Sequence, residues 1–299
     1  METVMTATIP EHLRFPRGQQ VAGEILLVSS SGIYLRFGER ILLLSDNSWG
    51  ILPIGIGLVS FKEAVVLLRP QAGQPVTVAE ERLVFPCGTV RLIPLAASEP
   101  TSENPTPELS AIRRAAEELA ALKKYRGISM LVQPLVLGVK PENMLLQNPY
   151  CAHGCFYLEK LIKALHYGEQ SQICTCVEKL LGLGVGLTPS ADDVLLGMLY
   201  VFRRLPRKCP ESVALLREQV EQLCDSCTSQ ISAAYLKAVC RGAPFERMER
   251  IFLGMCGEDS LDIQLLTEIG SNSGSEMLLG MLIALQICGY DISVKEELL

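Results

Sequence analysis

Residues 182–193 combine more features able to bind a small molecule than any other stretch of this sequence. The stretch reads Gly-Leu-Gly-Val-Gly-Leu-Thr-Pro-Ser-Ala-Asp-Asp and precedes an apolar run at 194–202. Glycines at alternate positions let the backbone adopt positive φ and approach other groups closely. Pro189 and Ser190 are typical of the first residues of a helix. Backbone N–H groups at such a turn, together with the Thr188 and Ser190 hydroxyls, are suited to hold a small anion.

This glycine-rich loop differs from the two familiar phosphate-binding motifs. No lysine precedes its Ser/Thr, the glycine spacing is G-x-G-x-G, and the preceding segment 176–181 has a helical pattern, so neither a P-loop nor a dinucleotide fingerprint fits. Asp192 and Asp193 would repel a bare anion. A phosphate or carboxylate beside them therefore needs a lysine, an arginine or a divalent cation such as Mg²⁺. No other cofactor is indicated.

The start of the predicted helix recurs later in the chain. Residues 190–199 align without gaps onto 273–282, and a hydroxyl residue stands two positions before each serine, Thr188 and Ser271. Such an internal repeat suggests two helix N-termini that face a common centre. The predicted substrate- or anion-binding residues are Gly184, Gly186, Thr188, Ser190, Ser273 and Gly274.

The acidic residues of the two copies divide into two groups. Ser190-x-x-Asp193 and Ser273-x-x-Glu276 both fit a capping box, in which the third helical side chain reaches back to the N-cap N–H. Asp193 and Glu276 are therefore predicted to be helix caps. Asp192 aligns with Ser275 and has no required role in capping. It is the predicted catalytic residue, which would orient an amide group of the substrate or a divalent ion.

The cysteines and histidines give a weaker signal. Eleven cysteines in a long chain favour reduced thiols. The pairs at 151/155 and 174/176, with His153, allow a zinc site of three thiolates and one imidazole. Neither spacing is the usual C-x-x-C, and cysteine often fills a core as a small apolar side chain. The second interpretation is favoured, so no metal ligand is assigned. None of the histidines adjoins the glycine-rich loop, and no Ser/His/Asp set is visible.

Composition limits the class of protein. At 299 residues with 48% hydrophobic side chains, the chain is long enough for two domains with cores of their own. The net charge of −6 gives no electrostatic reason to expect nucleic acid. The basic cluster at 203–208 follows an apolar helix and is interpreted as the cap of its C-terminus. No secretory signal pattern is visible, and the apolar runs are shorter than the roughly 20 residues of a membrane span. We expect a cytoplasmic protein.

Two types of pattern divide the chain, and together they predict an α+β fold. Residues 1–95 predict a β-rich barrel or sandwich, with strand candidates at 21–28, 32–37, 41–44, 64–68 and 83–93. Segment 49–57 is interpreted as a turn between strands, with a pocket-lining loop shared with the helical half as the alternative. Residues 96–110 carry three prolines and predict a linker. Residues 111–299 predict a mainly helical domain.

The helical half has several candidate helices. They lie at 108–125, 156–167, 170–181, 191–204, 210–241 (with a possible break), 244–255, 259–269 and 275–288. The connection at 127–149 contains three prolines and cannot be one helix. Both copies of the repeated motif therefore belong to the helical half.

The two motifs resemble those of a known family. The pattern G-x-G-x-G-L-T-P-S-x-D-D-x-L-x-G at 182–197, with S-G-x-[D/E]-x-L-x-G at 273–280, is similar to the family that includes the AllH subunit of bacterial oxamate carbamoyltransferase, from anaerobic allantoin breakdown. Glu276 stands where an aspartate is usual. The helical segment 232–242 and the turn at 53–55 also resemble family features. Ala191, Asn272 and the cysteines around His153 depart from the family pattern.

The resemblance implies a subunit of a carbamoyltransferase complex, which exchanges a carbamoyl group between an oxamate-type amide and phosphate. It implies partner subunits encoded nearby and does not say which subunit carries the chemistry. The alternative is a non-catalytic protein that binds or senses a metabolite, with the active site on a partner. In a third interpretation, the glycines serve only to let helices pack closely against each other.

Overall fold

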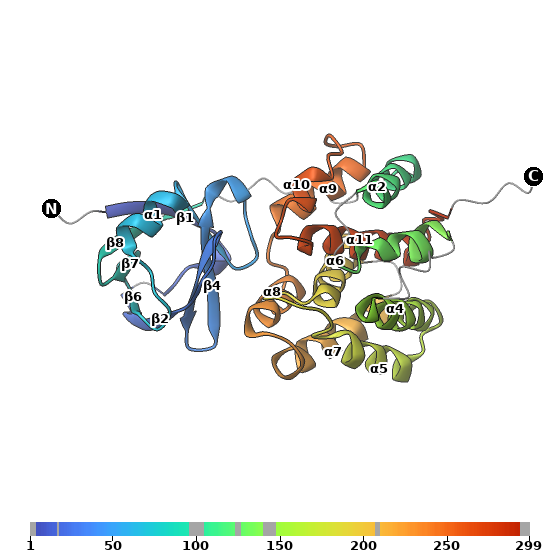
Figure 1. Ribbon diagram of the computed structural model, residues 1–299, viewed down its shortest axis with the longest axis horizontal. Coiled ribbons are helices and arrows are strands. Elements are labelled where there is room, and N and C mark those ends of the chain that lie inside the picture. The colour runs from blue at the N-terminus through green and yellow to red at the C-terminus, as the bar shows by residue number, and fades with distance from the viewer. Residues whose placement is uncertain are drawn as a thin grey trace, which may run out of the picture. The chain divides into compact units, whose positions relative to one another are not determined.

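The computed structural model describes residues 4–16, 18–95, 105–122, 127–139, 148–206 and 210–293. The chain forms two compact units, Met1–Thr101 with Ala243–Arg247, and Ser102–Gly242 with Met248–Leu299. The first unit is a β-barrel and the second is helical, which confirms the predicted α+β class (Figure 1). Each unit is described by itself below.

The first unit is a closed barrel whose eight strands all lie within residues 4–94. The strands are β1 (Val4–Ile9), β2 (Val21–Val28), β3 (Gly32–Phe37), β4 (Arg40–Asp46), β5 (Gly55–Leu58), β6 (Pro75–Ala79), β7 (Arg82–Phe85) and β8 (Gly88–Pro94). Their order around the barrel is β1-β5-β4-β3-β2-β6-β7-β8. The β1/β8 and β4/β5 pairs are parallel and the others antiparallel. Closure pairs each of these strands on both sides, so none of the described strands leaves an open sheet edge.

The period-2 alternation of the strands fills the barrel interior. Along β3, Ile33, Leu35 and Phe37 are buried, while Tyr34 and Arg36 are partly exposed. The core consists of such inward-facing side chains, joined by those of one helix. The sequence pattern left barrel and sandwich open, and the continuous pairing from β1 to β8 decides for the barrel.

Two predicted strands need correction. Segment 83–93 forms two strands, β7 and β8, with a turn at 86–87. Segment 64–68 is not a strand. The segment is part of helix α1 (Phe61–Leu68), whose N-cap Ser60 accepts a hydrogen bond at its hydroxyl from the Glu63 N–H at 3.4 Å. The pattern Ser60-x-x-Glu63 has the spacing of a capping box, which favours a helix start over a strand. The apolar run that suggested a strand instead supplies one face of this helix, with Ala64 and Leu68 buried against the barrel core.

Replacing Ser60 with alanine should therefore destabilise the barrel by about 1 kcal/mol, the usual loss for a helix N-cap. Urea unfolding followed by circular dichroism measures the change. Ser31→Ala is the matched control, because Ser31 is exposed and caps no helix. Equal unfolding midpoints for the two variants would contradict the capping role of Ser60.

Segment 49–57 was predicted as a turn between strands, and only part of it is one. Residues 50–54 connect the short 3₁₀ turn η2 (Asn47–Trp49), which follows β4, to β5, and residues 55–57 belong to β5. The first unit also includes residues from much later in the chain. Glu246 donates its N–H to the Ile51 carbonyl, and its Oε2 accepts from the Ile51 N–H, each at 2.9 Å. This pairing joins residues far apart in sequence, so no local pattern predicts it.

The second unit is helical. Its elements are α2 (Leu109–Ala121), the turns η3 (Ser129–Leu131) and η4 (Gln133–Leu137), α4 (Pro149–Tyr167), α5 (Gln170–Leu180), α6 (Ser190–Arg204), α7 (Pro210–Cys227), α8 (Gln230–Cys240), most of α9 (Glu246–Met255), α10 (Gln264–Thr267) and α11 (Ser273–Ile287). The candidate helix 210–241 is broken between α7 and α8, where Ser229 caps α8. Of the predicted linker, residues 96–104 lie outside the described residues, and α2 begins within the rest of it. None of the described helices has the length and hydropathy to cross a membrane.

Helices α6 and α11 lie side by side at the centre of the helical unit (Figure 1). Almost every residue of both is buried. Gly197 of α6 lies against the Met277 carbonyl, and the equivalent Gly280 of α11 lies against the Val194 carbonyl. Val194 and Met277 are themselves equivalent positions, so the two contacts are reciprocal and the helices pack without a shift in register. Thr188 meets Ser273 at the helix starts and Gly197 meets Met277 further along, so the two helices run in the same direction. Their N-termini are therefore brought together.

Candidate functional site

The glycine-rich loop between α5 and α6 has the backbone conformation that its glycines predict. Gly184 has φ +132° and Gly186 has φ +101°, values that other residues rarely adopt. Gly184 also lies so close to Ser190 that a Cβ would be 3.0 Å from the Ser190 side chain. The Ala191 N–H donates to the Leu183 carbonyl at 3.0 Å and folds the loop back onto the first turn of α6.

The two copies of the motif meet at their helix starts. The Thr188 and Ser273 hydroxyls are hydrogen-bonded at 3.0 Å, which joins the loop before α6 to the first residue of α11. This contact confirms that the repeated segments face a common centre. It follows from the parallel packing of α6 and α11, because both helices begin at the same level.

Each acid of the two motifs lies beside the serine that begins the other helix. Glu276 of α11 is within hydrogen-bonding reach of the Ser190 hydroxyl, and Asp193 of α6 is within reach of the Ser273 and Thr188 hydroxyls. The N-cap residues of these helices, Pro189 and Asn272, make no side-chain cap hydrogen bond. Asp193 and Glu276 therefore do not form the predicted capping boxes. Close packing of the helices places each acid beside the first turn of its neighbour.

Asp192 is held by the protein at both carboxylate oxygens. Oδ1 accepts from the Gly182 N–H at 2.8 Å, and Oδ2 accepts from the Ser232 hydroxyl at 2.6 Å and from the Thr228 hydroxyl. Its side chain is buried, and this burial raises the pKa of the carboxyl against the opposing effect of the three hydrogen bonds. The arrangement ties the loop to the start of α8 and leaves Asp192 outside the pocket described next.

A pocket of about 140 Å³ opens at the two helix starts. It is lined by Gly127, Asn148, Tyr150, Gly184, Val185, Gly186, Leu187, Thr188, Ser190, Ser271, Asn272, Ser273 and Glu276. Five of the six predicted binding residues line it. The sixth, Gly274, packs against α10, where a Cβ would be 3.1 Å from the Cα of Thr267. No lysine or arginine is among these lining residues.

Unpaired backbone donors border this pocket. Within the described residues, the N–H groups of Val185, Gly186 and Leu187 donate to no acceptor, and neither do those of Ser271 and Asn272. Such N–H groups carry the partial positive charge of a helix start or turn and attract oxygen atoms of an anion. Neutral donors therefore surround a space of the size of a small molecule.

The acids at the pocket favour their neutral form. Burial raises the pKa of Asp193 well above its ordinary value, and the neighbouring Glu276 raises it further. Burial likewise raises the pKa of Glu276, against hydrogen bonds from the Ser190 hydroxyl and the Ile128 N–H at 3.0 Å. Oδ2 of Asp193 is buried without a hydrogen-bond partner in the described residues. A carboxyl that stays protonated donates a hydrogen bond to an anion in place of repelling it.

The described residues contain no group of three or more His, Cys, Asp and Glu side chains arranged to hold a metal ion. Cys151 donates to the Gly127 carbonyl at 3.5 Å and Cys155 to Glu159 at 3.7 Å. Burial raises the pKa of both thiols to about 11, which disfavours the thiolate that zinc requires. Asp193 and Glu276 alone do not fit Mg²⁺, which prefers six oxygen ligands and retains water in most protein sites.

Several lining residues were not predicted from the sequence. Asn148 caps α4 by accepting from the Tyr150 N–H at 3.0 Å, a role that the Asn148-Pro149 pair signals. Gly127 lies against the Glu276 carboxyl, where an added Cβ would overlap the carboxyl unless Glu276 moved. No local pattern marks Gly127 as part of the site, because its contact with Glu276 depends on the tertiary fold.

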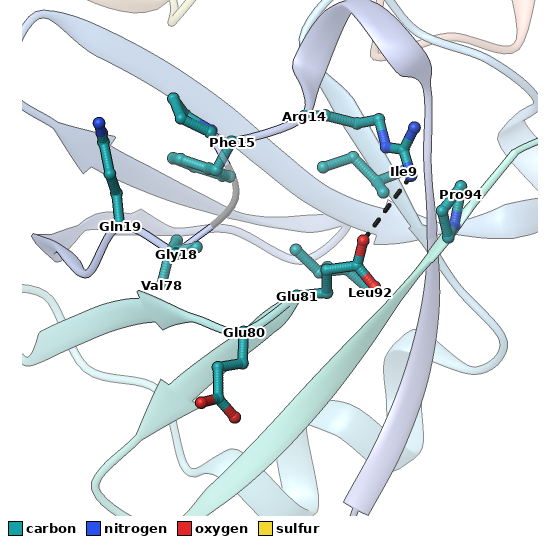
Figure 2. A pocket seen from close by; sticks show the side chains of 11 residues that line it. Ile9, Arg14, Phe15, Gly18, Gln19, Val78, Glu80, Glu81, Leu92 and Pro94 are labelled. Carbon is teal, nitrogen blue, oxygen red and sulfur yellow. Dashed lines mark ion pairs between the residues drawn. The ribbon is translucent and has the colours of Figure 1, made fainter.

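The barrel unit has a separate cavity of about 350 Å³ (Figure 2). Its walls include Ile9, Val78 and Leu92, and Arg14 and Glu81 form an ion pair of 3.7 Å at its edge. None of the residues of the two motifs lines this cavity. The pocket at the starts of α6 and α11 is therefore the candidate site.

The motif segment also matches a known family. The family model for oxamate carbamoyltransferase subunit AllH matches residues 180–285. The matched segment contains both copies of the motif, so the resemblance to that family is confirmed over this part of the chain. No solved structure matches the chain.

Proposed function

We propose that this chain is a subunit of an oxamate carbamoyltransferase-type complex, and that its pocket at the starts of α6 and α11 binds phosphate or the carboxylate of an oxamate-like substrate. The observation that carries the proposal is the set of unpaired N–H donors at 185–187 and 271–272 around a pocket of about 140 Å³. The family match over residues 180–285 supports the reaction class.

The chemistry of carbamoyl transfer suits this set of donors. An oxygen of phosphate attacks the carbamoyl carbon, a C–O bond forms, and the C–N bond to the oxamate amide breaks as its nitrogen takes up a proton. Negative charge develops on the carbamoyl oxygen after the C–O bond forms and before the C–N bond breaks. Fixed N–H and hydroxyl donors stabilise such an oxyanion and need no histidine base to do so. In the neutral form, Glu276 adds one further donor.

We assign a positioning role to Asp192. Both of its oxygens accept hydrogen bonds from the protein. Asp192 therefore holds the glycine-rich loop in position and does not contact the substrate. The direct contacts in this proposal come from Thr188, Ser190, Ser273 and the loop N–H groups. This assignment differs from the sequence prediction, in which Asp192 orients the substrate.

A second candidate is a non-catalytic subunit that binds or senses the anion while a partner carries the active site. The observation that favours it is the set of lining residues, which includes no histidine, lysine or cysteine to act as a base. In this case, phosphate binding and turnover depend on different residues of the complex.

Thr188→Val tests the two candidates, because it removes the hydroxyl and keeps the shape of the side chain. Thr175→Val is the matched control, since among the described residues the exposed Thr175 hydroxyl of α5 donates to the Ser171 carbonyl alone. The chain is assayed alone and with the proteins encoded beside it, for phosphate-dependent carbamoyl phosphate formation. We expect Thr188→Val to lower turnover about a hundredfold, with Thr175→Val unchanged.

Phosphate binding to the chain alone, measured by thermal shift and titration calorimetry, separates the outcomes. Loss of binding and of turnover in Thr188→Val supports a catalytic pocket. Loss of binding with full turnover in the complex supports the sensing subunit. If the wild-type protein binds neither phosphate nor oxamate, both candidate functions are contradicted. The interpretation in which the glycines serve only helix packing is then favoured.

A further inference from the structure

Another cavity of the helical unit, of about 410 Å³, lies at the C-terminal end of α6, away from the motif pocket at its start. Apolar side chains form its floor, among them Leu199, Phe202 and Val239. Its volume is within the usual range for sites of small organic ligands. No residue of this cavity lines the motif pocket.

Three arginines border this cavity, each from a different helix. Arg203 is in the last turn of α6, Arg217 is in the middle of α7, and Arg241 is the C-cap residue of α8. All three are exposed, so their charges are accessible to solvent. In a chain of net charge −6, this gathering of positive charge is local.

Glu221 compensates the charge of Arg241 only in part. Glu221 pairs with Arg241 at 3.3 Å, and the Arg241 side chain is 71% exposed, so the pair is a weak surface ion pair. Within the described residues, Arg217 has no acidic partner. A ligand with two negative charges and several oxygens can displace Glu221 and engage more than one guanidinium.

The positions of the arginines decide between a binding site and simple helix capping. Cations at a helix C-terminus are stabilised by the helix dipole, which accounts for Arg203 and Arg241. Arg217 is in the interior of α7, where the dipole offers no such stabilisation. At Gly242, which has φ +91°, a Cβ would be 3.3 Å from the Arg203 guanidinium carbon. The glycine thus leaves room for that guanidinium beside the cavity.

We propose that this cavity is a second ligand site, which binds an organic dianion with an apolar portion, of the phosphate monoester class. The arginines would bind the phosphate oxygens, and the apolar portion would pack on Leu199, Phe202 and Val239. The proposal does not depend on carbamoyl transfer, since it uses none of the residues of the motif pocket. The barrel cavity is a weaker candidate, because Arg14 is paired with Glu81 there.

Phenyl phosphate is the probe, because it joins a dianion to an aromatic ring. Its binding to the full chain is measured by titration calorimetry, beside inorganic phosphate and phenol. We expect saturable binding that weakens at high salt and falls about tenfold or more in Arg217→Gln. Arg114→Gln is the matched control, because Arg114 is an exposed helical arginine paired with Glu118 at 3.7 Å. It should bind the probe as the wild type does.

The Thr188→Val variant shows whether phenyl phosphate binds in the motif pocket and not in the cavity at the end of α6. If phenyl phosphate loses affinity in Thr188→Val and keeps it in Arg217→Gln, the second site is absent. Equal affinity in Arg217→Gln and Arg114→Gln, or no saturable binding at all, also overturns the proposal. Phenol and inorganic phosphate should each bind more weakly than phenyl phosphate, because each lacks half of the expected contacts.

Discussion

Replacing Gly197 with alanine is expected to destabilise the helical unit by about 3 kcal/mol or more. A Cβ on Gly197 would overlap the Met277 carbonyl oxygen and lie 2.9 Å from its carbon. These are backbone atoms of a buried helix and cannot turn aside as a flexible side chain can. The helices would have to separate, which opens an interface between two largely buried helices and moves the two helix starts apart.

Urea unfolding followed by circular dichroism measures the effect of Gly197→Ala. Gly154→Ala is the matched control, since Gly154 is also inside a helix and a Cβ there makes ordinary contacts, the nearest at 3.5 Å from Leu131. Alanine is the better helix former by about 1 kcal/mol, so this control should be neutral or stabilising. By the equivalence of the two motifs, Gly280→Ala should behave as Gly197→Ala does. A Gly197→Ala variant as stable as the wild type would show that α6 and α11 do not pack this closely.

Asp193→Asn should gain stability relative to the wild type as pH rises. The folded-state pKa of Asp193 is raised well above its ordinary value by burial and by Glu276. Between the unfolded and folded pKa values, the folded protein therefore binds more protons than the unfolded chain. Its stability contribution is fully present below the unfolded pKa and is lost as pH rises through the folded pKa. Asparagine does not titrate, so the variant avoids this loss.

Urea midpoints of Asp193→Asn and wild type, compared from about pH 5 to about pH 9, check the expectation. The difference should move in favour of the variant with increasing pH. Asp46→Asn is a control of opposite sign, because hydrogen bonds from Ser48 and from the Phe61 N–H lower the pKa of Asp46. Its stabilising contribution is present above the unfolded pKa, so the loss in this variant should stay constant over the same range. A constant difference for Asp193→Asn would mean that its carboxyl is not held in the neutral form.

The same carboxyl connects stability to the proposed function. A buried acid with an unpaired oxygen costs stability, and such costs are common at functional sites. We therefore expect Asp193→Asn to bind phosphate more weakly while it unfolds later at high pH. The Ser273 and Thr188 hydroxyls would lose their carboxyl partner, and with it their orientation at the pocket.

Local chemistry in the sequence determined much of the candidate site. The glycines at 184 and 186 adopt the positive φ values that their type predicts, and five of the six predicted binding residues line one pocket. The repeat itself predicted that two helix starts meet, because equivalent buried helices can pack about a shared centre. The β-rich and helical halves followed from periods of 2 and 3.6 residues.

The roles of the acids were decided by tertiary structure. The same spacing, a serine three residues before an acid, occurs at Ser60 and at Ser190, yet the first serine caps its helix and the second bonds to an acid of another helix. The difference arises because α6 packs against α11 closely enough for hydroxyls and carboxyls to cross between them. Asp192 likewise meets Ser232 through the placement of α8. A sequence motif specifies which groups are available at a helix start, and only the packing of distant helices decides which partners those groups find.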